Sequence, residues 1–388
     1  LRMYLVAMSS AALAASFLIW SRLIRWGAPL AAGLFAVNWS TLFYGSEVSP
    51  NLFVAYAAVA AVGMAVWYGR ELSARQLAAL AAMIAVAAVF RPSDAALLAV
   101  AAVAAAFAVE RRSVRVELLA AVVTGFGLGL VPWLLEAWVR FGGPLNRLQQ
   151  ASDAVGGGIS VKLAEHARLL DGPLIGPDAS GGVITAGLLW VGVLGLLGLV
   201  GAFAPGRHRR AGAAALVTSA LMSLPYLFSV HVLAPRFLLP ALALLCAAAG
   251  VGVGSLLEAN RRATVGVLAA VILACALWNV SNVSRIEEDQ VEVRSQSEVL
   301  GSFVRGRAGD KKCSFVSQYG YPQVELASAC DGRLFVIGDT AGPERLEALA
   351  EEGQRVFVVS AADPMLGAGW ECETVETPGD LSWHVCTR

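Results

Sequence analysis

The sequence predicts a polytopic α-helical membrane protein of about ten transmembrane helices, followed by a small α/β domain. The chain has 388 residues, of which 57% are hydrophobic and only 15% are charged, so it is more apolar than an average soluble domain. The apolar residues come in runs about as long as a bilayer is thick. From about Arg285 the composition turns polar. We therefore expect a membrane domain over residues 1–284 and a soluble domain over residues 285–388.

Each predicted span holds roughly 20 mostly apolar residues, or fewer where neighbouring helices shield its ends. Ten stretches qualify: residues 3–20, 28–44, 50–68, 76–90, 94–109, 114–135, 183–204, 211–230, 236–257 and 263–283. The fourth and fifth are short and are separated by "FRPSD" at 90–94. They are therefore either two spans or one re-entrant pair.

Arginines collect in alternate connections between the predicted spans. These are Arg22, Arg25, Arg70, Arg75, Arg111, Arg112, Arg115, Arg207, Arg209, Arg210, Arg261 and Arg262. The positive-inside rule places these connections in the cytoplasm. Both ends of the chain, the long segment 140–182 and everything after Val283 are then expected outside, so the protein is a multi-pass cell-membrane protein with an extracytoplasmic C-terminal domain. Because the first span begins outside and the sequence starts at Leu1 without Met, we expect an N-terminally truncated chain, with one more helix and an external loop upstream.

Glycines alternate at 125, 127 and 129 and again at 250, 252 and 254. A dinucleotide-binding loop would need a preceding strand and a downstream acidic residue. Both sets instead lie within predicted spans, which favours close packing of helices.

The polar tail predicts a three-layer α/β domain with a parallel sheet. Strand-like runs at 313–317, 333–338 and 355–361 alternate with helical patterns at 321–329 and 343–352, after a helix over 286–307. A closing hairpin turns at Gly379, which places Cys372 and Cys386 directly opposite each other, so we expect a disulfide there. Cys313 with Cys330 is the weaker companion pair. No Cys/His spacing indicates zinc, and no cofactor is indicated, although a divalent metal stays possible.

Five polar residues stand at helix ends on the predicted outer side: Glu47, Arg91, Arg140, His231 and Arg236. Three of them also have structural interpretations. Glu47 could be an idle loop residue, Arg140 could extend to lipid headgroups, and His231 could be an interfacial residue. Signatures of familiar soluble enzymes are absent from the sequence. Lys plus Arg and Asp plus Glu both number 29, so no nucleic-acid partner is expected.

Arg91 and Arg236 depart from the positive-inside pattern, and each neighbours a proline. A cation at such a position favours an anion, and a guanidinium matches phosphate oxygens in a bidentate way. Lipid-linked phosphate is the expected partner. The nearby Asp94 or Ser93 is expected to cap the following helix.

The segment 142–182 is too long for a simple connection. Within it, "ISVKLAEHARLLDG" (159–172) has apolar residues at helical spacing with charged residues around them. It predicts an amphipathic helix on the outer leaflet, which either forms the wall of a groove for an acyl or prenyl chain or is a plain surface helix.

Four stretches resemble the GT-C superfamily of membrane glycosyltransferases, in particular bacterial mannosyltransferases of the protein-O-mannosyltransferase type. They are "GSEVSPNLFVAYAAVA", the helix, Arg-Pro, helix segment that ends in "FRPSDAALLAVAAV", "GLVPWLLEAWVRFGGPL" and "HVLAPRFLLPALALLCAAAG". Each is weakly specific alone, but they follow in the order that the family shows, and with the polar tail the resemblance covers the whole chain.

The resemblance implies a hexosyl or pentosyl transferase of the cell envelope. It would move a sugar from a polyprenyl-phosphate donor in the membrane lipid to a glycan or protein acceptor, by direct displacement with inversion. The family's catalytic acid lies in the first external loop, which this sequence does not contain. By resemblance, Glu47 is a second acidic residue of the catalytic site, and Arg91, His231 and Arg236 bind the donor phosphate or the acceptor. Arg140 is a further candidate substrate-binding residue.

Two other functions fit the same sequence. A transporter or flippase of lipid-linked sugars would also place cations on a lipid path, but it should show charges near the bilayer midplane and paired broken helices. A catalytically inactive membrane scaffold could present the tail to a partner. An Asp-Asp or Asp-Glu pair upstream of Leu1 would favour the enzyme.

Overall fold

The computed structural model describes most of the chain, in two compact units, Leu1–Ser284 and Arg285–Arg388. The described residues are 2–47, 49–67, 73–107, 112–154, 161, 163–172, 185–228, 234–259, 262–317, 321–334, 350–351, 354–360, 369–378 and 382–388.

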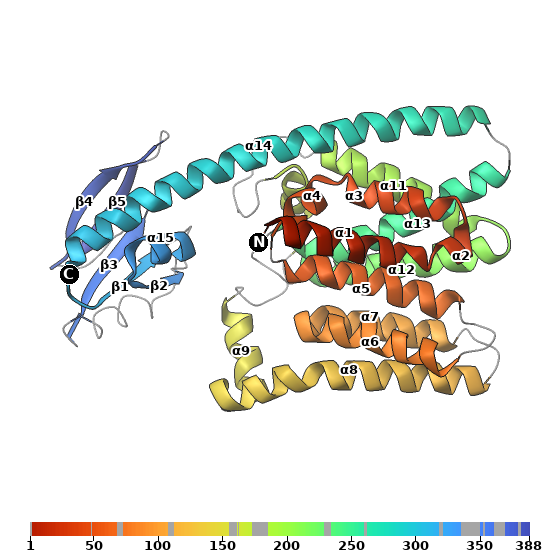
Figure 1. Cartoon of the computed structure of the whole chain (residues 1–388), viewed down its shortest axis with the longest axis horizontal. Helices are drawn as coiled ribbons and strands as arrows, with labels where there is room; N and C mark the ends of the chain where they lie inside the picture. Colours follow the sequence, from red (N-terminus) through yellow and green to blue (C-terminus); the bar gives the residue numbers. More distant parts are fainter. Residues whose placement is uncertain are drawn as a thin grey trace. The chain divides into compact units, whose positions relative to one another are not determined.

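The described part of the first unit is entirely helical (Figure 1). Its elements are α1 (Arg2–Leu18), α2 (Ser21–Ile24), α3 (Gly27–Ala36), α4 (Trp39–Gly45), α5 (Pro50–Trp67), α6 (Ala74–Phe90), α7 (Pro92–Phe107), α8 (Arg112–Phe141), α9 (Pro144–Ala154), α10 (Leu163–Leu169), α11 (Ala186–Phe203), α12 (Arg207–Phe228), the 3₁₀ helix η1 (Pro235–Leu238), α13 (Leu239–Glu258) and the first part of α14 (Arg262–Ala308).

The predicted polytopic helical fold with a small C-terminal sheet is confirmed, because each predicted span lies mainly in helix among the described residues. The number of ten membrane-crossing helices is not confirmed. Among the described residues, six helices are long and apolar enough to cross a membrane by length and composition: Pro50–Trp67, Arg112–Phe141, Ala186–Phe203, His208–Phe228, Pro235–Glu258 and Ala269–Ala308. Four shorter apolar helices accompany them: Arg2–Leu18, Gly27–Ala36, Ala74–Phe90 and Pro92–Ala105. The uncertain fourth and fifth segments are two separate helices, α6 and α7, which contact each other.

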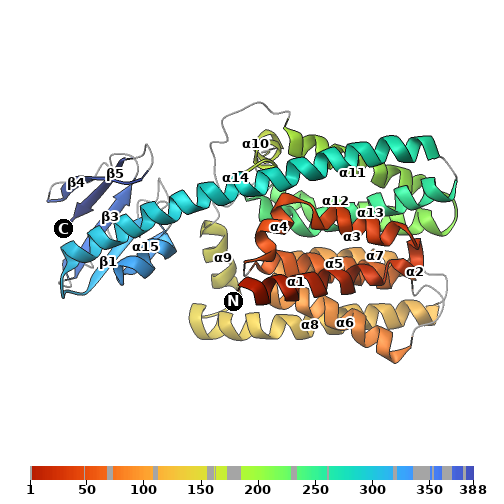
Figure 2. The same ribbon diagram turned by 45° about the horizontal axis from the view of Figure 1, so that its top comes forward.

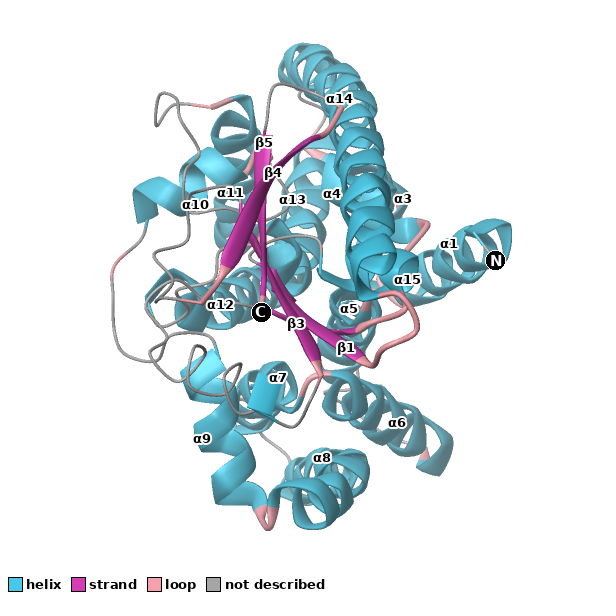
Figure 3. Cartoon of the chain, turned by 90° about the vertical axis from the view of Figure 1, so that its left-hand side faces the viewer, coloured by secondary structure: helices cyan, strands magenta, loops and turns pink. Residues whose placement is uncertain are grey.

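Helices α5 and α13 form the centre of this unit. In the spans Pro50–Trp67 and Pro235–Glu258, 78% of the residues of an 18-residue apolar stretch are buried. Helix α13 contacts α3, α5, α11 and α12, while α6, α7 and α8 form a neighbouring group (Figure 3). Glycines permit the closest approaches. A Cβ at Gly252 would lie 2.0 Å from the Leu197 carbonyl oxygen, and one at Gly125 would lie 2.3 Å from the Ala81 carbonyl oxygen. The close-packing interpretation of the alternating glycines is therefore confirmed at these positions.

The helices run back and forth, so alternate connections meet at the same end of the unit (Figure 1). One end holds α2 and the start of α8, and with them the described arginines of the predicted cytoplasmic set. The other end holds the start of α5, the α6–α7 junction, the end of α8 and η1, where Glu47, Arg91, Arg140 and Arg236 lie. We call this second end the polar end.

The structure departs from the prediction in two places. The predicted span 28–44 is broken into α3 and α4, because the Asn38 side chain caps α4 by accepting a hydrogen bond from the Ser40 N–H at 3.1 Å. In contrast, the predicted span 263–283 and the predicted polar helix 286–307 form one continuous helix, α14, of 47 residues. No proline or glycine stands between residues 283 and 286 to end it.

In the second unit, the described strands form one mixed sheet in the order β2-β1-β3-β5-β4. The strands are β1 (Cys313–Ser317), β2 (Asp331–Leu334), β3 (Arg355–Ser360), β4 (Glu371–Glu376) and β5 (Ser382–Thr387), and α15 (Tyr321–Ser328) connects β1 to β2 (Figure 1). The first three strands are parallel, as expected from the alternating pattern, and the closing hairpin adds two antiparallel strands.

Residues of β3 alternate between two small cores, one on each face of its sheet. Phe357 and Val359 pack with Leu300 of α14, and Val356 and Val358 pack on the other face. The register places Cys372 directly opposite Cys386, and these two residues form a disulfide. Cys313 and Cys330 form the second one.

Candidate functional site at the polar end of the helical unit

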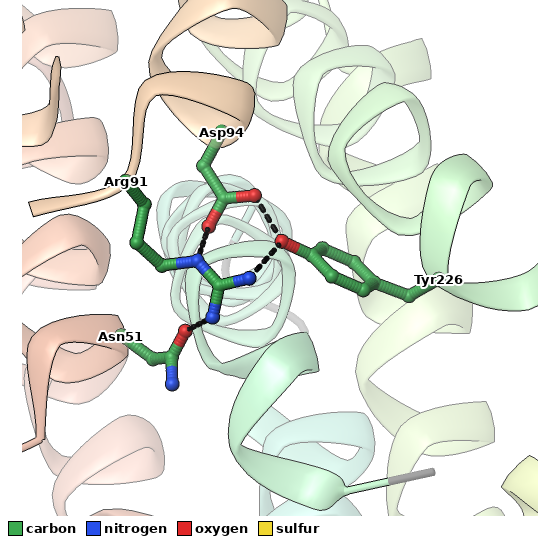
Figure 4. A network of polar contacts seen from close by, with 4 residues as sticks. All are labelled: Asn51, Arg91, Asp94 and Tyr226. Atoms are coloured by element: carbon green, nitrogen blue, oxygen red, sulfur yellow. Dashed lines mark hydrogen bonds and ion pairs between the residues drawn. The ribbon is translucent and has the colours of Figure 1, made fainter. Parts of the chain in front are cut away.

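A buried network of four polar side chains joins three helices at the polar end (Figure 4). The Arg91 guanidinium donates to the Asn51 side-chain oxygen of α5 and, at 2.9 Å, to the Tyr226 hydroxyl of α12. Its Nε lies 3.1 Å from Oδ2 of Asp94 in α7. The Tyr226 hydroxyl donates in turn to the other Asp94 oxygen. We call these four residues, Asn51, Arg91, Asp94 and Tyr226, the Arg91 clamp.

The local sequence explains how Arg91 reaches its partners. Arg91 precedes Pro92, and its backbone is extended (φ −150°, ψ 91°), as the residue before a proline prefers. The chain therefore turns between α6 and α7, and Pro92 begins the new helix. Asp94 follows in the first turn of α7, three residues after Arg91.

The clamp is an ion pair removed from water. The Asp94 side chain is 1% exposed and the Arg91 side chain is 21% exposed. A buried carboxylate is costly unless a cation and hydrogen bonds compensate it, and here it has both. Asp94 therefore acts as the countercharge of Arg91 instead of a simple helix cap.

The clamp also touches η1 through the ring of Phe237. This ring stacks on the Tyr226 ring, with centroids 5.4 Å apart and an interplanar angle of 17°. The Arg91 guanidinium carbon lies 5.0 Å from the Phe237 centroid, within the range of a cation–π contact. Phe237 is thus held by two members of the clamp, and its chain neighbour is Arg236.

Arg236 is half-buried and lies 5.4 Å from the Phe237 ring centroid. It interacts electrostatically with the buried Tyr44 phenol of α4, as does Glu47. The Tyr44 hydroxyl makes no hydrogen bond within 3.5 Å among the described residues, but Arg236 is close enough to interact with it. Glu47 itself pairs with Arg2 at 3.4 Å. Around Tyr44 the structure therefore brings together two of the predicted site residues, Arg236 and Glu47. No carboxylate forms an ion pair with Arg236 in the part of the chain that the structure describes.

Arg140 lies in the last turn of α8, with its side chain 72% exposed. It pairs with Glu136 at 3.4 Å, and Glu136 also pairs with Arg147 of α9. Arg147 further stacks on Trp133, 4.9 Å from the ring centroid. No contact between described residues joins this group to the Arg91 clamp or to Arg236.

An apolar cavity of about 230 Å³ lies beside η1. Residues of α10, α11, α12, α13 and α14 line it, together with Trp39 of α4 and Pro235 and Leu238 of η1. The predicted amphipathic segment contributes Leu163, His166 and Ala167 of α10, and Leu170 just after it, to the cavity lining. Helix α10 contacts α11 and α12 (Figure 2). The segment thus forms a wall of a cavity. The Trp190 indole N–H, buried in the lining, has no hydrogen-bond partner among the described residues.

His231 lies outside the described residues, so its predicted role is not addressed by the geometry. Among the described residues, no group of three His, Cys, Asp or Glu side chains could hold a metal ion. Sequence reasoning missed Asn51, Tyr226, Phe237 and Tyr44. The signal for them is weak: each is a polar or aromatic residue next to the end of an apolar helix.

These features define a multispanning helical membrane protein with its buried charges and its apolar cavity at one end. The fold is similar to that of ArnT. The chain is similar to crystal structures of ArnT from Cupriavidus metallidurans, one in the apo state (13% identity, TM-score 0.60) and one bound to undecaprenyl phosphate (13%, 0.53). Each likeness covers 99% of this chain and 83% of ArnT. An Archaeoglobus fulgidus oligosaccharyltransferase is also similar (14% identity, 93% of this chain, 59% of that chain, TM-score 0.47). The sequence matches no protein-family model and no curated protein.

Proposed function

We propose that the protein is an integral membrane glycosyltransferase that takes a sugar from a polyprenyl-phosphate donor and transfers it to an acceptor outside the cytoplasm. The observation that carries this proposal is the arrangement around η1, which has a cation on one side and an apolar cavity on the other. The fold supports it, because similarity to ArnT extends over nearly the whole chain and one ArnT structure holds undecaprenyl phosphate.

The geometry of η1 separates the two parts of such a donor. Residues three apart lie on the same side of a 3₁₀ helix, and Pro235 and Leu238 both line the cavity. Arg236 is outside that lining and faces Tyr44 and Phe237. The prenyl chain would begin in the cavity and the phosphate would lie against Arg236.

The size of the cavity limits what it accepts. At about 230 Å³ it is smaller than typical ligand pockets, which measure roughly 300–1,000 Å³. It would hold the first isoprene units next to the phosphate, and the rest of the chain would lie in the lipid.

The reaction is a direct displacement at the anomeric carbon. An acceptor hydroxyl loses its proton to a carboxylate and forms a new C–O bond at the anomeric carbon, while the bond between that carbon and the phosphate oxygen breaks. The configuration at the anomeric carbon is inverted. Negative charge grows on the departing polyprenyl phosphate. A prepositioned Arg236 stabilises this charge more in the transition state than in the bound donor. Glu47, beside Tyr44, is proposed as an acidic residue of the site, and Arg140 and His231 as contacts of the donor or acceptor.

The orientation follows from the arginines. The arginine-rich end would be cytoplasmic, and the polar end and the C-terminal unit would lie outside. Donor and acceptor would then meet on the extracytoplasmic face.

The proposal is tested with the full-length protein in sealed vesicles. Undecaprenyl-phosphate-linked hexose and pentose, each radiolabelled in the lipid, are supplied as donors, and release of free undecaprenyl phosphate is followed with and without candidate glycan and protein acceptors. We expect acceptor-dependent release of undecaprenyl phosphate from at least one donor. If the intact lipid-linked sugar only crosses the bilayer, the protein is a transporter. Binding with neither release nor crossing would support a scaffold.

A further inference from the structure

We propose that Arg91 is a positioning residue: the Arg91 clamp holds Phe237 in place and thereby sets the position of Arg236, and Arg91 itself does not bind the donor phosphate. The catalytic consequence of this inference rests on the proposed function. The mechanical part, in which the clamp determines where residue 236 lies, does not.

All three nitrogens of the Arg91 guanidinium already have partners within the protein. Nε pairs with Asp94, and the two terminal nitrogens donate to Asn51 and Tyr226. A phosphate that drew Arg91 away would leave Asp94, 1% exposed, as a buried and unpaired charge. That penalty is among the largest that a single contact can produce. Arg91 is therefore far less available to a ligand than Arg236.

The path from the clamp to Arg236 is short. Arg91 and Tyr226 both contact the Phe237 ring, at 5.0 Å and 5.4 Å respectively. Phe237 is directly bonded to Arg236 in the chain, and its N–H donates to the Ala234 carbonyl at 3.0 Å. Fixing this ring thus fixes the backbone on which Arg236 stands.

The η1 helix needs such an anchor. It has four residues, and 3₁₀ helices are short because their hydrogen-bond geometry is poor. A charge that stabilises a transition state must be held in place before the reaction. Side-chain contacts from Tyr226 of α12 and from Arg91 at the α6–α7 junction supply the rigidity that four residues of 3₁₀ helix lack.

The mechanical part can be tested without any turnover. Cys246 and Cys275, the free cysteines of the structure, are first replaced by alanine. Arg236→Cys is then introduced, and its alkylation rate by a polar maleimide is measured in detergent. Tyr226→Phe removes the hydroxyl that joins Arg91 to Asp94 but keeps the ring that stacks on Phe237.

A matched control is available in the same unit. The Tyr56 hydroxyl is also buried and bonds to Ser9 Oγ at 2.6 Å, and no hydrogen bond or ring contact between described residues joins Tyr56 directly to the clamp side chains or to η1. We expect Tyr226→Phe to raise the alkylation rate at residue 236 by about fivefold, the factor that one lost hydrogen bond gives, and Tyr56→Phe to leave it unchanged. Asp94→Asn is the second clamp variant. Equal rates in the parent and both clamp variants, with all proteins monodisperse, would overturn the proposal.

The catalytic part is tested by combining variants. Tyr226→Phe alone should lower kcat by about tenfold and change the donor KM little, because a misplaced charge weakens transition-state binding most. In the Arg236→Ala background the same change should cost less than about twofold, since the residue being positioned is gone. If the fold-losses of kcat from Tyr226→Phe and Arg236→Ala multiply instead, Arg91 contacts the phosphate independently of Arg236. If the parent shows no turnover, the proposed function fails while the alkylation result still decides the positioning.

Discussion

Replacing Arg91 with methionine should destabilise the protein strongly, and removing Asp94 as well should restore much of the loss. In Arg91→Met the Asp94 carboxylate keeps its burial, at 1% exposure, but loses its cation. Removing one partner of a buried ion pair costs about 3–5 kcal/mol. Because the Arg91 side chain is 21% exposed and some water reaches the pair, we place the loss near the lower figure, about 3 kcal/mol.

The double replacement Arg91→Met with Asp94→Leu removes both charges. Apolar substitutes for a buried ion pair are often close to neutral, but here the Tyr226 hydroxyl loses both of its partners. One unsatisfied hydroxyl costs about 1–3 kcal/mol. We therefore expect the double variant to recover about half of the loss, and the triple variant with Tyr226→Phe to recover more.

The measurement is thermal unfolding in detergent, read as the temperature at which half of the protein stays monodisperse. A loss of about 3 kcal/mol corresponds to a shift of roughly 6–12 °C for a unit of this size. Arg140→Met is the control, because that side chain is 72% exposed and its pair is worth under about 1 kcal/mol. Two results would contradict this: Arg91→Met unfolding at the same temperature as the parent protein, or a double variant less stable than Arg91→Met. In either case the clamp does not stabilise the protein through its ion pair.

Four further outcomes are expected. Arg236→Ala should fold normally, since no described carboxylate loses a partner, but should lower turnover about a hundredfold, and Arg236→Lys should recover only part of it; equal turnover per folded molecule would remove the phosphate role. Tyr44→Phe removes a buried hydroxyl that makes no hydrogen bond within 3.5 Å among the described residues but interacts with Arg236, so it should change stability little while raising the donor KM. Replacing Cys372 and Cys386 with alanine should cost the isolated tail unit about 2–4 kcal/mol of unfolding free energy in urea titrations. A reporter fused after Arg388 that fluoresces only in the cytoplasm should stay dark, and a bright signal would reverse the proposed orientation.

The positions of the helices were predictable because bilayer thickness sets the length of an apolar run. The break at Asn38 was not, since one asparagine barely changes the average hydropathy of residues 28–44. Its signal was local: asparagine is a favoured N-cap, and a short helix follows it. The continuity of α14 was not predicted because the composition changes sharply within this one helix. A change from apolar to polar residues marks a change of solvent, and a helix can cross that boundary without interruption.

The clamp was only half visible in the sequence. Arg91 was identified because it departs from the positive-inside pattern and neighbours a proline at the end of an apolar helix. Its partners Asn51 and Tyr226 lie 40 and 135 residues away, and the spacing within one helix says nothing about which other helix packs against it. Asp94 was correctly noticed, but its nearness to a helix start favoured a cap over an ion pair.

The pairing of the tail cysteines bears on how that unit can mature. Four cysteines allow three sets of two bridges, and this chain uses the set in which each cysteine joins its nearest cysteine neighbour along the sequence, 17 and 14 residues apart. Neither bridge encloses or crosses the other. During synthesis the first pair is complete before either member of the second has emerged, so oxidation in chain order leads directly to the native bonds. Refolding of this unit should therefore depend on an oxidant and very little on a disulfide isomerase.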